Sequence, residues 1–126
     1  MIKTLIFSLF FSISGFSQQT EIKIKNLSCE YKENPLGIET NSPRLSWQLI
    51  SKSRNQVQSA YRIIVSDNPD GFENVKNKIW DSGKKLSDQS IQIEYKGLPL
   101  KSAKKYYWKV MIWDGNGHPT SWSPVA

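Results

Sequence analysis

One stretch near the C-terminus decides the fold: Lys104-Lys105-Tyr106-Tyr107-Trp108-Lys109-Val110-Met111-Ile112-Trp113-Asp114. It is rich in aromatic and β-branched residues, contains no Gly or Pro, and runs into the turn signal Asp114-Gly115-Asn116-Gly117, which predicts a β-strand. Alternate side chains of a strand point to opposite faces, so one face is wholly large and apolar and is expected to line a core: Tyr106, Trp108, Val110, Ile112. The other face is mixed and is expected to be partly covered: Tyr107, Lys109, Met111, Trp113. A strand with large side chains on both faces is typical of the middle of a sheet. We call this strand the spine.

Short stretches of period-two alternation also precede the spine, separated by turn signals rich in Asn, Asp, Gly and Pro. They are Glu21–Lys25, Arg44–Leu49, Ala60–Ser66, Ile79–Asp81 and Ile91–Tyr95. No long segment has the periodicity of a helix. The pattern therefore predicts an all-β chain folded as an antiparallel β-sandwich.

Two features indicate a sandwich of the fibronectin type III-like or immunoglobulin-like kind. Trp47 stands between Leu45 and Leu49 in an early strand, where its ring can fill the space between two sheets. Leu100 precedes Tyr106 by six residues, which resembles the leucine and corner tyrosine that lead into strand F of fibronectin type III domains. The hydroxyl of a corner tyrosine bonds a nearby backbone group, whereas an ordinary core aromatic would not need to.

The final strand of such a sandwich is expected to be truncated. Only His118–Ala126 follows the turn, and Pro119 and Pro124 have no amide hydrogen to donate. A short run around Thr120–Ser123 could pair well, so we expect part of the spine's edge to be open.

The N-terminus has the pattern of a secretory signal peptide. Lys3 is followed by an almost wholly apolar stretch, and Gly15 and Ser17 are the small residues expected at a cleavage site. We therefore predict a signal peptide at residues 1–17 and one β-sandwich accessory domain at residues 18–126. The protein would be exported, to the periplasm, the cell surface or the medium, without a membrane span after cleavage. Its single Cys29 cannot form an internal disulfide and is expected to be a small buried side chain.

A set of short motifs in fixed order resembles the N-terminal β-sandwich of secreted bacterial α-L-rhamnosidases. The motifs are Asn34-Pro35-Leu36-Gly37-Ile38, Pro43-Arg44-Leu45-Ser46-Trp47, Gln58-Ser59-Ala60-Tyr61-Arg62-Ile63, Trp80-Asp81-Ser82-Gly83-Lys84, Tyr107-Trp108-Lys109-Val110, Trp113-Asp114-Gly115-Asn116-Gly117 and Ser121-Trp122-Ser123. The resemblance covers about Ile24 to Ala126. It implies an inverting glycoside hydrolase that removes terminal rhamnose, with further sandwich domains and an α/α-barrel that carries the general acid and base. Because the chain stops before that barrel, the resemblance implies a fragment without catalytic residues.

The residues themselves agree that the chain holds no catalytic, cofactor-binding or metal site. Inverting glycoside hydrolysis needs two facing carboxyl groups about 6.5–9.5 Å apart, whereas most aspartates here stand in turns, where they cap backbone amides. With one Cys and one His there is no zinc ligand set, and no phosphate loop or dinucleotide fingerprint occurs. The formal net charge of +6 comes from lysines scattered over turns and solvent faces, which predicts solvated surface, or weak attraction to acidic glycans, and not a nucleic-acid partner.

A contact surface is the functional hypothesis that remains. The candidate residues are the aromatics of the mixed face and of the turns: Tyr107, Trp113, Trp80 and Trp122. They could cover sheet edges and pack against other domains of the same enzyme, which we favour. They could instead stack sugar rings of rhamnose-containing glycans, as in an independent carbohydrate-binding module. A cell-surface interaction domain is a further alternative.

Overall fold

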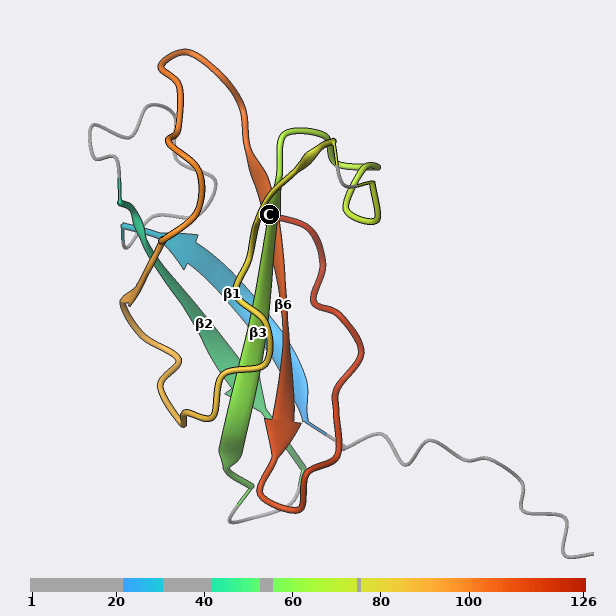
Figure 1. The fold of residues 1–126 in the computed structure, drawn as a ribbon. Coiled ribbons are helices and arrows are strands. Elements are labelled where there is room, and N and C mark those ends of the chain that lie inside the picture. The colour runs from blue at the N-terminus through green and yellow to red at the C-terminus, as the bar shows by residue number, and fades with distance from the viewer. Residues whose placement is uncertain (1–21, 31–41, 53–55, 75) are drawn as a thin grey trace, which may run out of the picture.

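The chain folds as two antiparallel three-stranded sheets packed face to face (Figure 1). The computed structural model describes residues 22–30, 42–52, 56–74 and 76–126. The first sheet has the order β1-β2-β5 and the second the order β4-β3-β6. The strands are β1 (Lys23–Cys29), β2 (Arg44–Ile50), β3 (Gln58–Ser66), β4 (Lys78–Asp81), β5 (Ile93–Glu94) and β6 (Tyr107–Asp114). The described segments contain no helix, and so none that could span a membrane. The predicted signal peptide and the motif at residues 34–38 lie outside the described residues.

β1 keeps its apolar side chains inward by means of a bulge. Its pairing with β2 shifts register between Lys25 and Ser28, and Asn26 adopts a positive φ of 51°. Asn is one of the few residue types that tolerate this left-handed conformation, and the extra residue turns the strand by one position. The inward set therefore has an irregular spacing: Ile22, Ile24, Leu27, Cys29.

β6 is the predicted spine, and its two faces are divided as expected. Trp108, Val110 and Ile112 point into the core, where Val110 and Ile112 are completely buried. The alternate residues of the strand are partly exposed on the other side of the sheet. β6 pairs with β3 from Ser66 opposite Tyr107 to Gln58 opposite Asp114.

The free edge of β6 is covered by His118–Ala126, so the expectation that it would be partly open is wrong. The amides of Thr120, Ser123 and Ala126 donate to the carbonyls of Ile112, Val110 and Trp108 at 2.8–3.0 Å. In the other direction, the side-chain hydroxyls of Thr120 and Ser123 accept from the amides of Ile112 and Val110, at 3.1 and 3.0 Å. The segment is not a regular strand, but the two hydroxyls take the place of missing ladder carbonyls and complete the pairing.

The two sheets are joined along one side by residues 82–92, which we call the strap. Lys85 exchanges two backbone hydrogen bonds with Tyr61 of β3, at 2.8 and 2.9 Å. Further on, the amide of Trp47 in β2 donates to the carbonyl of Ser90 at 2.9 Å. The strap thus leaves one sheet, crosses the side of the sandwich and enters the other sheet as β5 (Figure 1).

Trp47 is the centre of the core, as predicted. It is 2% exposed, and its ring meets the edge of Tyr61 with the centroids 5.5 Å apart. Its indole Nε1–H donates to the side-chain oxygen of Gln58 at 3.1 Å. The amide nitrogen of Gln58 in turn donates to the carbonyls of Ser87 and Gln89, which fixes the strap to the core.

Tyr106 is a corner tyrosine, which confirms the prediction from its spacing. Its hydroxyl accepts a hydrogen bond from the backbone amide of Lys101 at 2.7 Å, and Leu100 packs against the core. Cys29 is also buried as expected, and this burial, with the charge of Glu30, raises the pKa of its thiol to about 11.

Candidate functional site

The candidate surface is the side of the β4-β3-β6 sheet that faces away from the core, here called the outer face. Its floor consists of alternate residues of the three strands, and Phe72 and Trp122 lie over them. The side chains that form it are Arg62, Ile64, Phe72, Lys78, Asp81, Lys84, Tyr107, Lys109, Met111, Trp113 and Trp122.

The structure brings three of the four predicted contact aromatics to this face. Tyr107 and Trp113 are partly exposed in β6, and Trp122 reaches it from the covering C-terminal segment. Trp80 lies elsewhere. It pairs with inward-pointing Val65, and its ring packs edge-on against Tyr95 with the centroids 5.2 Å apart. Trp80 therefore belongs to the rim of the core.

Three rings of the outer face, those of Phe72, Trp113 and Trp122, are accompanied by a cation. The ammonium of Lys109 lies 4.6 Å from the ring centroid of Trp122 and 4.8 Å from that of Phe72. The guanidinium of Arg62 lies 5.7 Å from the same Trp122 ring. The ammonium of Lys84 lies 4.7 Å from the ring of Trp113. Because cations are attracted to the faces of aromatic rings, these contacts occupy surface on which a sugar ring would stack.

One carboxylate balances part of this charge. Asp81 accepts two hydrogen bonds from the guanidinium of Arg62, at 3.0 and 2.6 Å, and its carboxylate also lies 3.6 Å from the ammonium of Lys78. The bonds from Arg62, helped by the amide of Gly83, lower the pKa of Asp81 to about 2. Burial lowers the pKa of Lys109. The outer face thus carries a surplus of positive charge.

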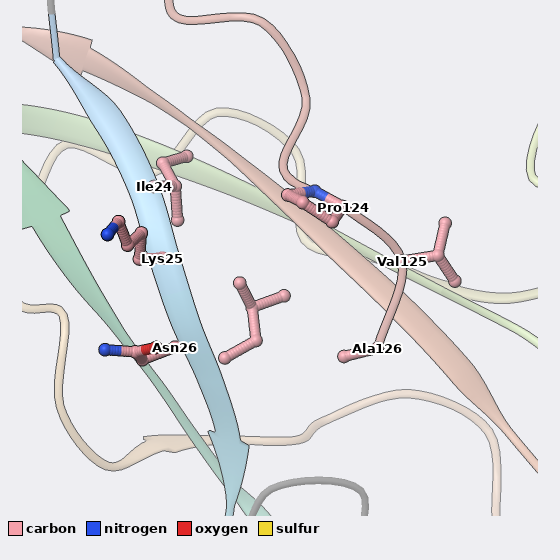
Figure 2. A pocket seen from close by; sticks show the side chains of 7 residues that line it. Ile24, Lys25, Asn26, Pro124, Val125 and Ala126 are labelled. Atoms are coloured by element: carbon pink, nitrogen blue, oxygen red, sulfur yellow. The ribbon is translucent and has the colours of Figure 1, made fainter.

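A groove opens beside β1 (Figure 2), the edge strand of its sheet away from β5 and the strap. It has a volume of about 280 Å³ and lies between β1 and the end of the chain. Its lining residues are Ile24, Lys25, Asn26, Leu27, Pro124, Val125 and Ala126. The hydropathy pattern gave no sign of this groove, because it depends on where the C-terminal segment lies. Its one charged side chain is Lys25, and no Asp or Glu side chain lines it, so the groove lacks the pair of carboxyl groups that glycoside hydrolysis uses.

Asp67 and Asp114, like Asp81, hold the structure together through their carboxylates. Asp114 is buried and accepts hydrogen bonds from the amides of Asn116 and His118, both at 2.9 Å, which closes the turn after the spine. Asp67 forms an ion pair with Lys104 at 3.2 Å. Within the described ranges no group of three or more His, Cys, Asp or Glu side chains is placed to hold a metal ion.

Comparison with known proteins gives the family. Residues 24–126 match a model of the Rha78A-like, N-terminal immunoglobulin domain. The chain belongs to this family. The immunoglobulin-like sandwich and the rhamnosidase resemblance predicted from the sequence are therefore confirmed.

Relatives of this N-terminal immunoglobulin domain are found in much longer proteins. An α-L-rhamnosidase of Streptomyces avermitilis is 38% identical over 102 residues, which are 81% of this chain and 10% of the relative. One from Formosa agariphila is 37% identical over 127 residues, covering 98% of this chain and 14% of the relative. The chain thus spans between a tenth and a seventh of these proteins.

Solved structures show the same domain. The crystal structure of the Streptomyces avermitilis α-L-rhamnosidase complexed with L-rhamnose matches with a TM-score of 0.79 and 37% identity, over 83% of this chain and 10% of that one. The α-L-rhamnosidase from Dictyoglumus thermophilum matches with a TM-score of 0.76 and 36% identity, over 82% and 12%.

Proposed function

We propose that this domain is the non-catalytic N-terminal module of an exported α-L-rhamnosidase and that it packs against other domains of that enzyme. The observation that carries the proposal is the match of residues 24–126 to the N-terminal domain family. The chain covers only 10–14% of the length of its relatives, which are α-L-rhamnosidases. The parent enzyme would be an inverting glycoside hydrolase that removes terminal α-L-rhamnose.

The make-up of the outer face supports a packing role. Trp, Tyr, Met and Arg are the residue types enriched in protein interfaces, and Trp113, Tyr107, Met111 and Arg62 lie together on it. Contacts between domains of one chain commonly bury several hundred Å² or more.

The catalytic part of the proposal is tested by activity. The purified chain should release no product from an aryl α-L-rhamnoside, whereas the longer rhamnosidase polypeptide that carries it should. Turnover by the chain alone that persists through purification, and is lost when one Asp is changed to Asn, would contradict a non-catalytic module.

The packing part is tested by unfolding. In the longer polypeptide, the module and its neighbour should unfold in one calorimetric transition, at a higher temperature than the isolated 126-residue chain. A separate transition at the temperature of the isolated chain would show that the module does not pack on its neighbours.

A carbohydrate-binding module is the second candidate, and one observation favours it: Tyr107, Trp113 and Trp122 share one face. The cations beside the Trp113 and Trp122 rings weigh against it. Titration of the chain with L-rhamnose and with rhamnose-containing oligosaccharides, followed by tryptophan fluorescence, distinguishes the two candidates. Saturable binding that Trp113→Ala abolishes would favour the glycan role.

Export is part of the proposal and rests on residues 1–17, which have the pattern of a signal peptide. Expression of the full chain in a Gram-negative host should yield periplasmic protein. Its N-terminal sequence should begin at Gln18.

A further inference from the structure

The outer face holds two ammonium groups that form no ion pair with a carboxylate of the described residues, those of Lys84 and Lys109. Lys109 lies between the rings of Phe72 and Trp122, and Lys84 lies beside Trp113. The carboxylate of Asp81 is engaged by Arg62 and Lys78. The rings hold both ammonium groups near the sheet, and the charge of Glu73 offsets that of Lys109 only in part.

Covering such a face with a neutral surface would be costly. An ammonium removed from water without a counter-charge loses more solvation free energy than contacts with aromatic rings restore. Burial lowers the pKa of Lys109, and the charges of Lys78 and Arg62 lower it further against the attraction of Glu73, so the ammonium is poorly stabilised in the isolated domain. A partner that places a carboxylate beside Lys109 would stabilise its ammonium.

From this geometry we infer that the partner of the outer face is an acidic surface of another domain, with carboxylates that meet Lys84 and Lys109. The inference rests on the proposed packing role and names the chemistry of the partner. The cations are held in place by Trp113, Trp122 and Phe72, so little side-chain freedom is lost when the carboxylates arrive.

The same arrangement favours a protein partner over an acidic polysaccharide. A sugar ring gains most by lying flat on an aromatic face, and the cations beside Trp113 and Trp122 occupy such positions. Carboxylates on Asp or Glu side chains can reach the ammonium groups without displacing them. The relatives also contain the polypeptide that such a partner requires, because this domain accounts for only 10–14% of their length.

The experiment compares two charge-neutralised variants of the longer rhamnosidase polypeptide. The outer-face variant combines Lys84→Gln and Lys109→Gln. The control variant combines Lys23→Gln and Lys96→Gln, two exposed lysines away from this face. Docking is measured as the rate at which a protease cuts the connection after the module, at low and high salt. The urea midpoint of each variant in the 126-residue chain separates loss of docking from loss of folding.

The outer-face variant should be cut at least about tenfold faster at low salt, and the control variant at the original rate. High salt should speed cutting of the unsubstituted protein and reduce the difference. Equal rates in both variants, with the module still unfolding together with its neighbour, would overturn the acidic partner and leave the packing role intact. Independent unfolding of the unsubstituted module would overturn both. Retention of the 126-residue chain on a polygalacturonate gel, lost only in the outer-face variant, would overturn the protein partner in favour of an acidic glycan.

Discussion

The hydroxyl of Tyr106 accepts a hydrogen bond from the backbone amide of Lys101, five residues earlier in the chain, at 2.7 Å. This bond holds the loop that enters β6 and brings Leu100 onto the core. Tyr106→Phe keeps the ring and removes only the acceptor, so it should lower the free energy of unfolding by about 0.5–1.5 kcal/mol. Urea unfolding measures the loss. Tyr107→Phe is the matched control and should be nearly neutral, because within the described residues no hydrogen bond involves its hydroxyl. Equal losses would show that the corner bond contributes nothing.

Trp47 and Trp113 should differ strongly in what they contribute to stability. Trp47 is 2% exposed and contacts the core on all sides, so Trp47→Ala should cost about 3–5 kcal/mol and bring the domain close to unfolding. Trp113 is partly exposed on the outer face, and Trp113→Ala should cost clearly less in the isolated chain. Equal losses in thermal or urea unfolding would mean that the two rings are comparably buried.

Ser123 should be essential for the pairing that covers β6. Its hydroxyl accepts from the buried amide of Val110 at 3.0 Å, and Ser123→Ala leaves that amide without a partner. The expected cost is about 1–3 kcal/mol in urea unfolding. Ser121→Ala, in the same segment but exposed, should change stability by less than about 0.5 kcal/mol. If the Ser123 variant matched the Ser121 variant, the hydroxyl would be replaceable by water.

Asp81 should make the domain less stable in acid. Its pKa is lowered from 3.8 to about 2, chiefly by Arg62, so its folded carboxylate binds a proton less readily than its unfolded one. The stability that it contributes is therefore complete above pH 4 and disappears as the pH falls toward 2. Urea midpoints measured from pH 5 to pH 2 should fall less steeply for Asp81→Asn than for the unsubstituted chain. Asp88→Asn, the same substitution at an exposed position in the strap, is the matched control.

Cys29 should be unreactive until the domain unfolds. Burial and the charge of Glu30 raise its pKa from 9.0 to about 11, which reduces the reactive thiolate at neutral pH by about a hundredfold. Iodoacetamide should therefore alkylate the native chain at least about a hundred times more slowly than the chain in concentrated urea. Fast alkylation of the native protein would mean that the end of β1 opens readily.

Period-two alternation was enough to predict most of the fold. It placed Trp47 between the sheets and divided the spine correctly, because side chains of a strand must alternate. It could not place Trp80, since β4 has only four residues and all of them are partly buried. The side chain of Trp80 points inward because Trp80 pairs with Val65 of β3, a residue distant in sequence.

The covering of β6 could not be read from hydropathy or from proline positions. The residues that pair with β6 are Thr120, Ser123 and Ala126, so they recur at every third position and not at every second. Pro119 precedes Thr120 and Pro124 follows Ser123, so neither proline stands where an amide donates to β6. The hydroxyls of Thr120 and Ser123 made this spacing possible, and the same residues elsewhere are ordinary turn formers.

The outer face was predicted only in part. The mixed side of the spine correctly indicated Tyr107 and Trp113 as partly covered aromatics. The cations beside the rings of the outer face come from β3, the strap and β6 itself, as Arg62, Lys84 and Lys109, and the rings of Phe72 and Trp122 come from two further segments. No local pattern shows that such distant side chains meet, so the charge of this face emerges only from the fold.

The strap makes the two sides of the sandwich unequal. On its side, backbone hydrogen bonds to Tyr61 and Trp47 tie both sheets to one continuous segment. On the side of the groove, β1 and Pro124–Ala126 line an open space (Figure 2). Transient opening of the domain should therefore begin at the groove, with the strap acting as the hinge. Backbone amides of β1 would then exchange their hydrogens with solvent sooner than those of β3, because local opening of the domain would start at the groove side.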